Sequence, residues 1–511
     1  MTGKVHRSDL LVLILAWLAF SVRVSGLDFQ SLWRDEVDAL RFATRALPEL
    51  LETFRRPGEN GPAYFVALRP WLATSGHSEF ALRFPSALAG TLAVPVIYVL
   101  VRRLAGRRPA LITALLATTA PYLIWYGQEA KMYAALTLLV PLSLWLTVEA
   151  AQRGGWWRWL VLYIVTALCF YTHLLAALVV PVQALWLLIL PSGRRPAQRW
   201  LNAGIYLGAL LLPYLPLLRW QAGMWLSTFE TGHPFVALGD IFAVLAVAFS
   251  QGVLPVRAPI LLLPAMLALI AGLGLWARGP SAQRVSASLP AEQQQPACSP
   301  TPGGWRMVAM LAVWLFLPPL AVYGISLGMP VFTDRYLIWC MPAFLALVSL
   351  GIVALASLWR PLGATVLAVM LLSSLSGVWA QGSQPIKSDF RAAARFVLDH
   401  HQPGDLLIFQ IPYGRYTFSY YSNAGTPGEP SAIGELPWID GPFTNNGANE
   451  VVVGEQMMRG TTGSQAAWLI ASEVSMWDQR ELTRAWLSNH GKATDQADLT
   501  RVSVTRYELQ K

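Results

Sequence analysis

An adjacent pair of acids follows the first apolar segment of the chain. Asp35 and Glu36 stand in the run Ser31-Leu32-Trp33-Arg34-Asp35-Glu36, within a polar stretch from Asp28 to about Phe80. A carboxylate can accept the proton of a hydroxyl group and so make the oxygen a better nucleophile. Because a helical pattern over 37–55 follows directly, the two acids could equally cap that helix in a solvated loop.

Other ionisable and aromatic residues lie at the ends of apolar segments: Arg83, Glu129, Lys131, His173, Arg335 and Tyr336. Each has a simple explanation alone, since an arginine can bind lipid headgroups and Glu129 can pair with Lys131. Together they predict a cavity that contains acids, bases and aromatic rings. Carboxylates beside cations suit transfer from a phosphate-linked donor, because arginine and lysine stabilise the charge of the departing phosphate.

The segments that must position these residues are apolar. Hydrophobic residues make up 55% of the 511 residues and charged residues 13%, against about 25% charged in a typical soluble domain. Spanning a bilayer takes roughly 20 apolar residues. We predict eleven spans, the first an uncleaved helix, at 10–27, 81–101, 109–127, 132–150, 159–176, 176–191, 201–218, 259–277, 307–328, 337–357 and 361–380.

Charge sets the expected orientation. The first 381 residues carry 27 Lys/Arg against 15 Asp/Glu, with basic clusters at Arg102-Arg103, Arg107-Arg108 and Arg194-Arg195. Such an excess is typical of cytoplasmic loops, and we expect no nucleic-acid partner. With Met1 in the cytoplasm, 237–255 is an outer helix that does not cross and 278–305 is a flexible inner loop. The candidate residues then share one outer face of the plasma membrane, where buried ionisable groups are usually functional.

A different pattern begins after Gln381. Phe390–Asp399 is predicted to be an amphipathic helix and Leu406–Ile411 a buried strand, followed by a β-branched run at 451–453 and a helix near 476–488. This alternation predicts a soluble α/β domain over 382–511. Under the same topology it lies outside the cytoplasm, after a transmembrane domain over 1–381 whose first outer loop is 28–80.

The motifs, in their order and spacing, resemble the bacterial membrane glycosyltransferases of the GT-C class, including the dolichyl-phosphate-mannose-protein mannosyltransferase family and the lipid A aminoarabinose transferase. The resemblance covers most of residues 10–410 and rests on Trp33-Arg34-Asp35-Glu36, Glu79–Leu88 with Arg102-Arg103, Gln128–Tyr133, and Arg335-Tyr336-Leu337. It implies a polytopic α-helical membrane protein with about eleven transmembrane helices. It also implies inverting transfer of a mannose-like or other sugar from a polyprenyl-phosphate donor to a hydroxyl of a glycan, lipid or protein.

The resemblance also implies a role for each residue. Asp35 and Glu36 are the expected catalytic residues, with Asp35 as the general base, and the expected phosphate-binding residues are Arg83, Lys131 and Arg335. The other expected site residues are Glu129, His173, Tyr336 and Tyr64. Relatives often have His-Pro-Pro-Leu-Tyr-Tyr where this chain reads Asn60-Gly61-Pro62-Ala63-Tyr64-Phe65, and often have arginine at the position of Lys131.

A metal ion is not required by the sequence. Some members of the class bind a divalent cation near the first-loop acids, and Asp35, Glu36 and Glu129 could supply oxygen ligands. No His/Cys spacing indicates a metal site, and the three cysteines, Cys169, Cys298 and Cys340, lie far apart.

Three other functions are compatible with many apolar helices. A flippase or transporter of lipid-linked sugars should show inverted repeats and broken helices near the bilayer midplane, and the sequence shows neither. Among enzymes, the close alternative is a ligase that moves whole oligosaccharides. A glycan-binding protein anchored by the helices would not need Asp35, Arg83, Glu129 and Arg335 on one face.

Overall fold

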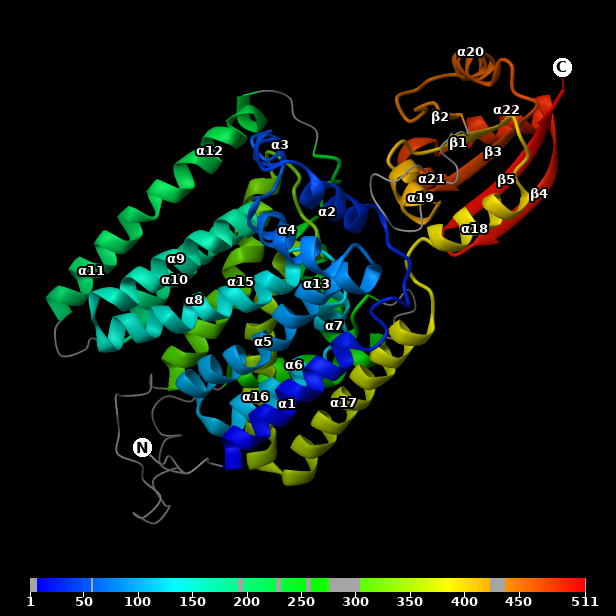
Figure 1. Cartoon of the computed structure of the whole chain (residues 1–511). Helices are drawn as coiled ribbons and strands as arrows, with labels where there is room; N and C mark the ends of the chain where they lie inside the picture. Colours follow the sequence, from blue (N-terminus) through cyan, green and yellow to red (C-terminus); the bar gives the residue numbers. More distant parts are fainter. Residues whose placement is uncertain are drawn as a thin grey trace. The chain divides into compact units, whose positions relative to one another are not determined.

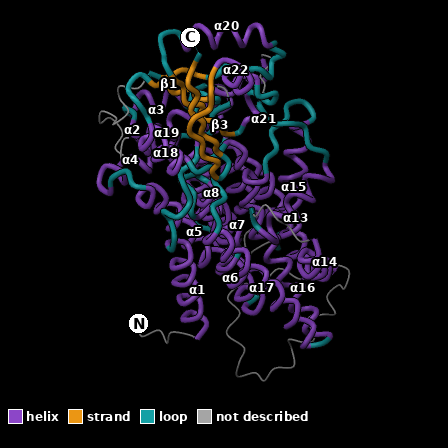
Figure 2. The backbone as a smooth tube through the Cα atoms, turned by 90° about the vertical axis from the view of Figure 1, so that its right-hand side faces the viewer, coloured by secondary structure: helices purple, strands orange, loops and turns teal. Residues whose placement is uncertain are grey.

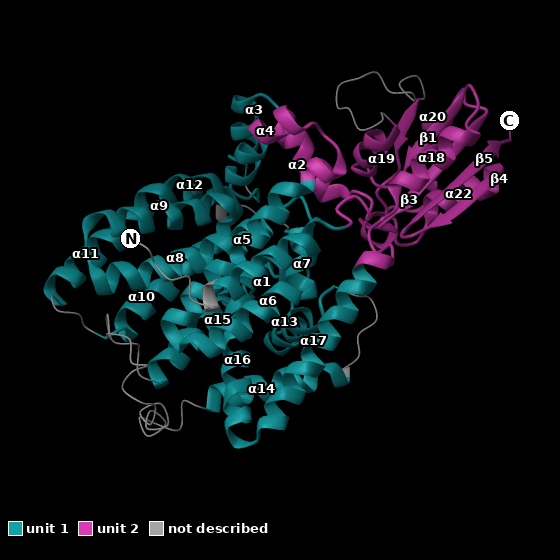
Figure 3. Cartoon of the chain, turned by 60° about the horizontal axis from the view of Figure 1, so that its bottom comes forward, with its two compact units in different colours: residues 1–25, 45–68, 83–381 teal, residues 26–44, 69–82, 382–511 magenta. Residues whose placement is uncertain are grey.

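The computed structural model describes residues 7–56, 58–191, 196–226, 231–253, 259–274, 304–422 and 437–510 (Figure 1). The chain forms two compact units (Figure 3). Unit 1 comprises residues 1–25, 45–68 and 83–381, and unit 2 comprises 26–44, 69–82 and 382–511. The predicted first outer loop is therefore divided between the units, and the part that carries Asp35 and Glu36 belongs to unit 2 together with residues 382–511.

Unit 1 is helical in every part that the structure describes. Its helices are α1 (Arg7–Val24), α3 (Leu47–Thr53), α6 (Arg107–Thr119), α7 (Pro121–Gly127), α8 (Tyr133–Arg153), α9 (Trp156–Thr172), η1 (Leu174–Leu178), α10 (Val179–Ile189), α11 (Pro196–Ala209), α12 (Leu211–Leu226), α13 (Leu238–Gln251), η2 (Pro259–Leu261), α14 (Leu262–Gly274), α15 (Gly304–Ser326), η6 (Asp334–Cys340), α16 (Met341–Leu358) and α17 (Arg360–Ser383). Helices α4 (Ala63–Ser75) and α5 (Glu79–Ala105) contribute residues to both units, and the last two residues of α17 belong to unit 2.

Six helical segments of the described chain are long and apolar enough to cross a membrane, or seven if the bent pair α6–α7 counts as one span. The pair bends by 56°, where Pro121 begins the second helix. Several other predicted spans form shorter apolar helices, among them Leu174–Ile189 and Leu262–Gly274. The protein is thus a multi-pass membrane protein, and the number eleven stays a prediction.

The segment predicted to lie outside without crossing forms α13, which has 14 residues. At about 1.5 Å per residue this helix is roughly 21 Å long, shorter than a hydrocarbon core of about 30 Å. The inner loop predicted at 278–305 and the cluster Arg194-Arg195 fall almost wholly outside the described residues.

Close helix packing in unit 1 depends on glycine. A Cβ atom at Gly351 would lie 1.7 Å from the carbonyl oxygen of Ala268, and one at Gly272 would lie 2.1 Å from that of Leu347. The backbones of α14 and α16 therefore touch at two glycines, as is usual where membrane helices pack without a hydrophobic driving force. The first loop before α4 uses the same device, because a Cβ atom at Gly61 would lie 2.0 Å from the carbonyl oxygen of Tyr171.

Unit 2 contains a five-stranded sheet, whose strands are orange in Figure 2 and labelled in Figure 1. The strand order is β2-β1-β3-β5-β4. Strand β1 (Asp405–Phe409) pairs in parallel with β2 (Trp438–Asp440) and β3 (Ala466–Ser472), and β5 (Val502–Leu509) runs antiparallel to β3 and to β4 (Gly491–Leu499). The helices of the unit are α2 (Arg34–Thr44), α18 (Phe390–His400), α19 (Gly414–Ser422), α20 (Glu450–Thr461), α21 (Val474–Trp477) and α22 (Leu482–His490).

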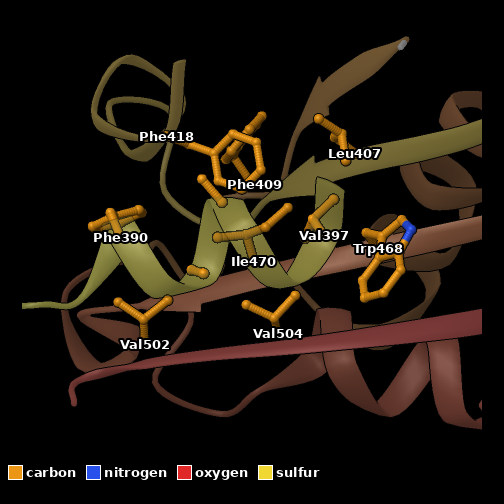
Figure 4. Close-up of a cluster of buried hydrophobic side chains, with 11 residues drawn as sticks. Phe390, Val397, Leu407, Phe409, Phe418, Trp468, Ile470, Val502 and Val504 are labelled. Carbon is orange, nitrogen blue, oxygen red and sulfur yellow. The ribbon is translucent and has the colours of Figure 1, made fainter. Parts of the chain in front are cut away.

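Helices cover both faces of this sheet. On one face Phe390 and Val397 of α18 pack against Trp468, Ile470 and other strand residues (Figure 4). On the other face α20 and α22 cover Leu406, Ile408, Leu469 and their neighbours. Successive residues of a strand point to opposite faces, so the fully buried run of β3 fills both cores.

Two segments fold differently from what their local sequence pattern favours. The β-branched run 451–453 lies in helix α20, because the side chain of Asn449 caps that helix by accepting a hydrogen bond from the backbone N–H of Val452 at 3.0 Å. A good cap at the right position outweighs a weak strand propensity. The helix expected over 37–55 is two helices, α2 and α3, with a break after Thr44.

Candidate active site

Seven of the nine candidate residues lie in unit 1, and Asp35 and Glu36 lie in unit 2. In unit 1 the centre of the group is Tyr336, in the first turn of η6. Its ring lies 4.6 Å from the ring of His173 and 6.0 Å from that of His233. The guanidinium carbon of the neighbouring Arg335 lies 5.8 Å from the ring centre of Tyr133, which is 6.4 Å from His173. The structure thus brings Arg335, Tyr336 and His173 together around Tyr133.

A cavity of about 230 Å³ opens beside this cluster. Its polar lining includes His173, His233, Tyr336, Gln221 and Asn60. The remaining lining is largely apolar, with Leu175, Leu178, Leu218, Ile325, Met329 and Val331. An apolar cavity with a few convergent polar groups is the usual form of a small-molecule site.

His173 is positioned by its own backbone. It follows α9, caps η1, and accepts a hydrogen bond from the backbone N–H of Leu175 on Nδ1 at 3.2 Å. Because Nδ1 accepts, the neutral ring carries its proton on Nε2. Nε2 is buried and has no hydrogen-bond partner among the described residues. A buried N–H of this kind can donate to a ligand oxygen.

The segment 58–61 forms one wall of the cavity. Gln221 of α12 holds it, since its Oε1 accepts from the backbone N–H of Gly58 at 2.8 Å and its Nε2 donates to the carbonyl oxygen of Glu59 at 3.0 Å. The close approach of Gly61 to Tyr171 then places this wall against the end of α9. Of the stretch where relatives often have His-Pro-Pro, Asn60 lines the cavity.

Lys131 and Tyr64 are joined through Ser86. The hydroxyl groups of Tyr64 and Ser86 lie 3.1 Å apart, and Ser86 donates to the carbonyl oxygen of Lys131 at 3.2 Å. The Lys131 ammonium lies 5.7 Å from the ring centre of Phe65. The half-buried lysine therefore stands over an aromatic wall, where a cation is less well hydrated.

Arg83 and Glu129 are both 1% exposed. Arg83 lies on α5, and Glu129 lies in the turn between α7 and α8, where its carbonyl oxygen accepts from the backbone N–H of Lys131 at 2.7 Å. Ionisable groups are costly to bury within a membrane and are usually kept there only where they have a role, so the burial of Arg83 and Glu129 keeps both as candidates.

In unit 2, Asp35 stands in the first turn of α2, half-buried. Its Oδ1 lies 3.5 Å from Nε of Arg34. Nη1 of the same guanidinium lies 3.8 Å from Oε2 of Glu473, and its carbon lies 4.4 Å from the ring centre of Tyr413. Burial opposes the charge of Arg34, but the nearby Asp35, Tyr413 and Glu473 outweigh it and raise the pKa of the guanidinium. A fixed positive charge therefore stands beside Asp35.

Glu36 has a different environment. Its side chain is fully buried, and its Oε2 accepts a hydrogen bond from Nζ of Lys387 at 2.8 Å. Glu36, expected to be catalytic together with Asp35, thus has a buried lysine as the partner of its carboxylate.

The described residues do not form a ready cation site. Among them, no group of three or more His, Cys, Asp or Glu side chains is close enough to hold a metal ion. The carboxylate of Glu36, one of the three expected ligands, already binds Lys387. We therefore derive no chemical step through a metal.

Sequence reasoning missed His233 and Gln221, both in the cavity lining. His233 lies between α12 and α13 with no motif around it, and only its rarity as one of seven histidines could have marked it. Gln221 sits within an apolar helix, and an amide in such a segment was the available signal.

The chain is similar to known proteins in part of its sequence and in its fold. Residues 59–220 match the family model described as dolichyl-phosphate-mannose-protein mannosyltransferase. No curated protein sequence matches the chain. Among solved structures, ArnT from Cupriavidus metallidurans aligns with a TM-score of 0.59 and 14% identity, covering 97% of each chain. The oligosaccharyltransferase of Archaeoglobus fulgidus aligns with a TM-score of 0.54 and 12% identity, covering 97% of this chain and 72% of its own.

The segment matched by the family model contains Tyr64, Arg83, Glu129, Lys131 and His173. At these identities the structural matches show a shared fold. The resemblance to GT-C membrane glycosyltransferases predicted from the sequence is confirmed, and the chain has the GT-C fold.

Proposed function

We propose that the protein is an inverting glycosyltransferase that moves a sugar from a polyprenyl-phosphate donor to an acceptor hydroxyl outside the cytoplasm. The lipids of proteins with this fold support the donor class. ArnT from Cupriavidus metallidurans has been solved with undecaprenyl phosphate, and AglB from Archaeoglobus fulgidus with a dolichol phosphate. The matched family model is also described by a dolichyl-phosphate sugar.

The observation that carries the proposal is the cavity in unit 1. Its apolar wall suits isoprenoid carbons, and its polar lining, with the buried Nε2–H of His173 and the hydroxyl of Tyr336, suits a sugar or phosphate oxygen. Arg335 stands next to Tyr336 in the chain, over the ring of Tyr133. A lipid phosphate needs this combination of apolar surface, cations and hydrogen-bond donors.

The residues divide the chemistry between them. Asp35 accepts the proton of the acceptor hydroxyl, whose oxygen attacks the anomeric carbon of the sugar. The bond from that carbon to the phosphate oxygen breaks, and polyprenyl phosphate leaves from the opposite face, so the anomeric configuration inverts. Arg335, Lys131 and Arg83 stabilise the charge on the leaving phosphate. No covalent sugar–enzyme intermediate is needed, unlike in retaining hydrolases.

The acceptor is a glycan, lipid or protein, and we place the reaction at the outer face of the plasma membrane. This side follows from the arginine-rich clusters Arg102-Arg103 and Arg107-Arg108, which we assign to the cytoplasm. Residues 382–511 then lie outside the cytoplasm, as the acceptor requires.

The test is an assay of purified full-length protein with a panel of polyprenyl-phosphate sugars. We expect loss of one donor, release of polyprenyl phosphate and a product of inverted anomeric configuration. Movement of a labelled donor across vesicles without its consumption would instead identify a flippase. Consumption of lipid-linked oligosaccharides alone would identify an oligosaccharide ligase, an activity that the fold shared with the archaeal oligosaccharyltransferase makes worth including.

A further inference from the structure

The proposed chemistry gives no role to the buried ion pair between Glu36 and Lys387, which lies in unit 2 next to Asp35 in the chain. Glu36 is 0% exposed and Lys387 is 6% exposed in their side chains, and their charged atoms lie 2.8 Å apart. Burying two charges costs several kcal/mol of desolvation for each ion, and a buried pair is seldom a net source of stability. Such a pair is better explained by what it holds in place.

What it holds is the turn that carries Asp35. Glu36 is the next residue after Asp35, and both lie in the first turn of α2. Lys387 comes four residues after the end of α17, so the pair ties this turn to the segment that follows the last apolar helix.

Two further contacts fix the chain just before Asp35. The side-chain amide of Gln30 donates to the carbonyl oxygen of Gln384 at 2.8 Å and accepts from the backbone N–H of Ile386 at 2.9 Å. The hydroxyl of Tyr421 accepts from the backbone N–H of Leu32 at 2.6 Å. Asp35 therefore lies between anchors on both sides, and all of the anchoring partners belong to residues 384–421.

We propose that Lys387 is a positioning residue for Asp35, acting through Glu36. Resting on the proposed function, this assigns Glu36 to support of the general base and gives residues 384–421 a part in catalysis. The ion pair has a defined direction, because the ammonium approaches one oxygen, Oε2, of the carboxylate. A displacement of about 1 Å in a catalytic group can cost 10²-fold in rate, so the orientation of this turn matters.

The experiment compares Lys387→Met with Lys387→Arg and with the double variant Glu36→Gln/Lys387→Met, all in the full chain. Lys492→Met is the matched control, since Lys492 lies on exposed strand β4. Three quantities are measured: turnover, donor affinity, and hydrogen exchange of the backbone amides of α2. The double variant removes both charges, so it relieves the buried unpaired carboxylate that the single variant leaves behind.

We expect Lys387→Met to lower kcat about ten- to hundredfold, to leave donor affinity unchanged and to speed exchange in α2. Lys387→Arg should recover part of the turnover because it keeps the charge. The double variant should regain thermal stability while its turnover stays low, because the directional contact is still missing.

Two results would overturn the proposal. Turnover of Lys387→Met that matches Lys492→Met would remove Lys387 from the mechanism. Turnover of the double variant that recovers together with its stability would make the pair purely structural. If the wild-type protein consumes no donor, the proposed function fails, and hydrogen exchange in α2 becomes the only test of positioning. Faster exchange in Lys387→Met would then support a role of Lys387 in positioning the turn of Asp35, and unchanged exchange would overturn that role.

Discussion

Replacing Asp35 by asparagine tests the central assignment, because it keeps the size of the side chain and removes its basicity. Loss of a general base typically lowers turnover by 10²–10⁴-fold, which corresponds to about 2.7–5.4 kcal/mol in the activation barrier. The structure predicts a much smaller effect on stability. Asp35 and Arg34 form a partly exposed pair at 3.5 Å, with side chains 16% and 26% exposed, and exposed pairs contribute about 0–1 kcal/mol.

Asp38 provides a matched control on the same helix. It pairs with Arg41 at 2.9 Å, and its side chain is 27% exposed, so Asp38→Asn should have a comparable effect on stability. The assay measures donor consumption under saturating donor, together with thermal unfolding of each variant. We expect Asp35→Asn to be slow and Asp38→Asn to be close to wild type, with donor affinity unchanged in both. A folded Asp35→Asn that turns over at the wild-type rate would refute the general-base assignment.

Three further predictions concern other parts of the molecule. Arg335→Ala should weaken donor binding about ten- to hundredfold, since a hydrogen bond to a charged group contributes about 1.5–3 kcal/mol, and Arg335→Lys should recover only part of the affinity. The control is Arg360→Ala, at an exposed position, which should bind the donor with unchanged affinity; the same result for Arg335→Ala would exclude Arg335 from the site. A membrane-impermeant thiol reagent added to intact cells should label Val451→Cys, at a position 68% exposed, and leave Cys298 unlabelled; labelling of both would contradict the eleven-span topology. Burial opposes ionisation of Asp405, but hydrogen bonds from a guanidinium, a backbone N–H and an indole N–H outweigh this effect and lower the pKa of the carboxyl group. The ionised carboxylate therefore stabilises unit 2 above the unfolded pKa, and this stabilisation is lost as pH falls through the folded pKa. Acid unfolding of Asp405→Asn with the same pH midpoint as the wild type would contradict this.

The apolar elements could be predicted from the sequence because their signal is local. Each of the eleven predicted spans falls on one or two helices of the structure, although several are shorter than a bilayer requires. The strand at Leu406–Ile411 appears as Asp405–Phe409 for the same reason, since a continuous apolar run is visible without knowledge of its neighbours.

The partners of the candidate residues could not be predicted, because they come from distant parts of the chain. The contact of Glu36 with Lys387 spans 351 residues, and nothing in the motif around Asp35 and Glu36 indicates it. Motif matching gave both acids a catalytic role, whereas packing distinguishes a half-buried carboxylate from a fully buried, paired one. His233 was missed for the same reason, because it lies in the cavity only through the fold that brings it close to Tyr336.

The assembly of unit 2 from three separate stretches of chain has a consequence for synthesis. Residue 30 bonds to residue 384, which is made 354 residues later. At about 5–20 residues per second, the helix that carries Asp35 waits roughly 20 to 70 s for its partners. During that time Glu36 has no lysine to bind, and its turn has no anchor. In a ribosome-bound chain, the turn that carries Asp35, the proposed general base, therefore lacks these contacts until residues 384–387 have been made, so we expect the newly made protein to order this turn late.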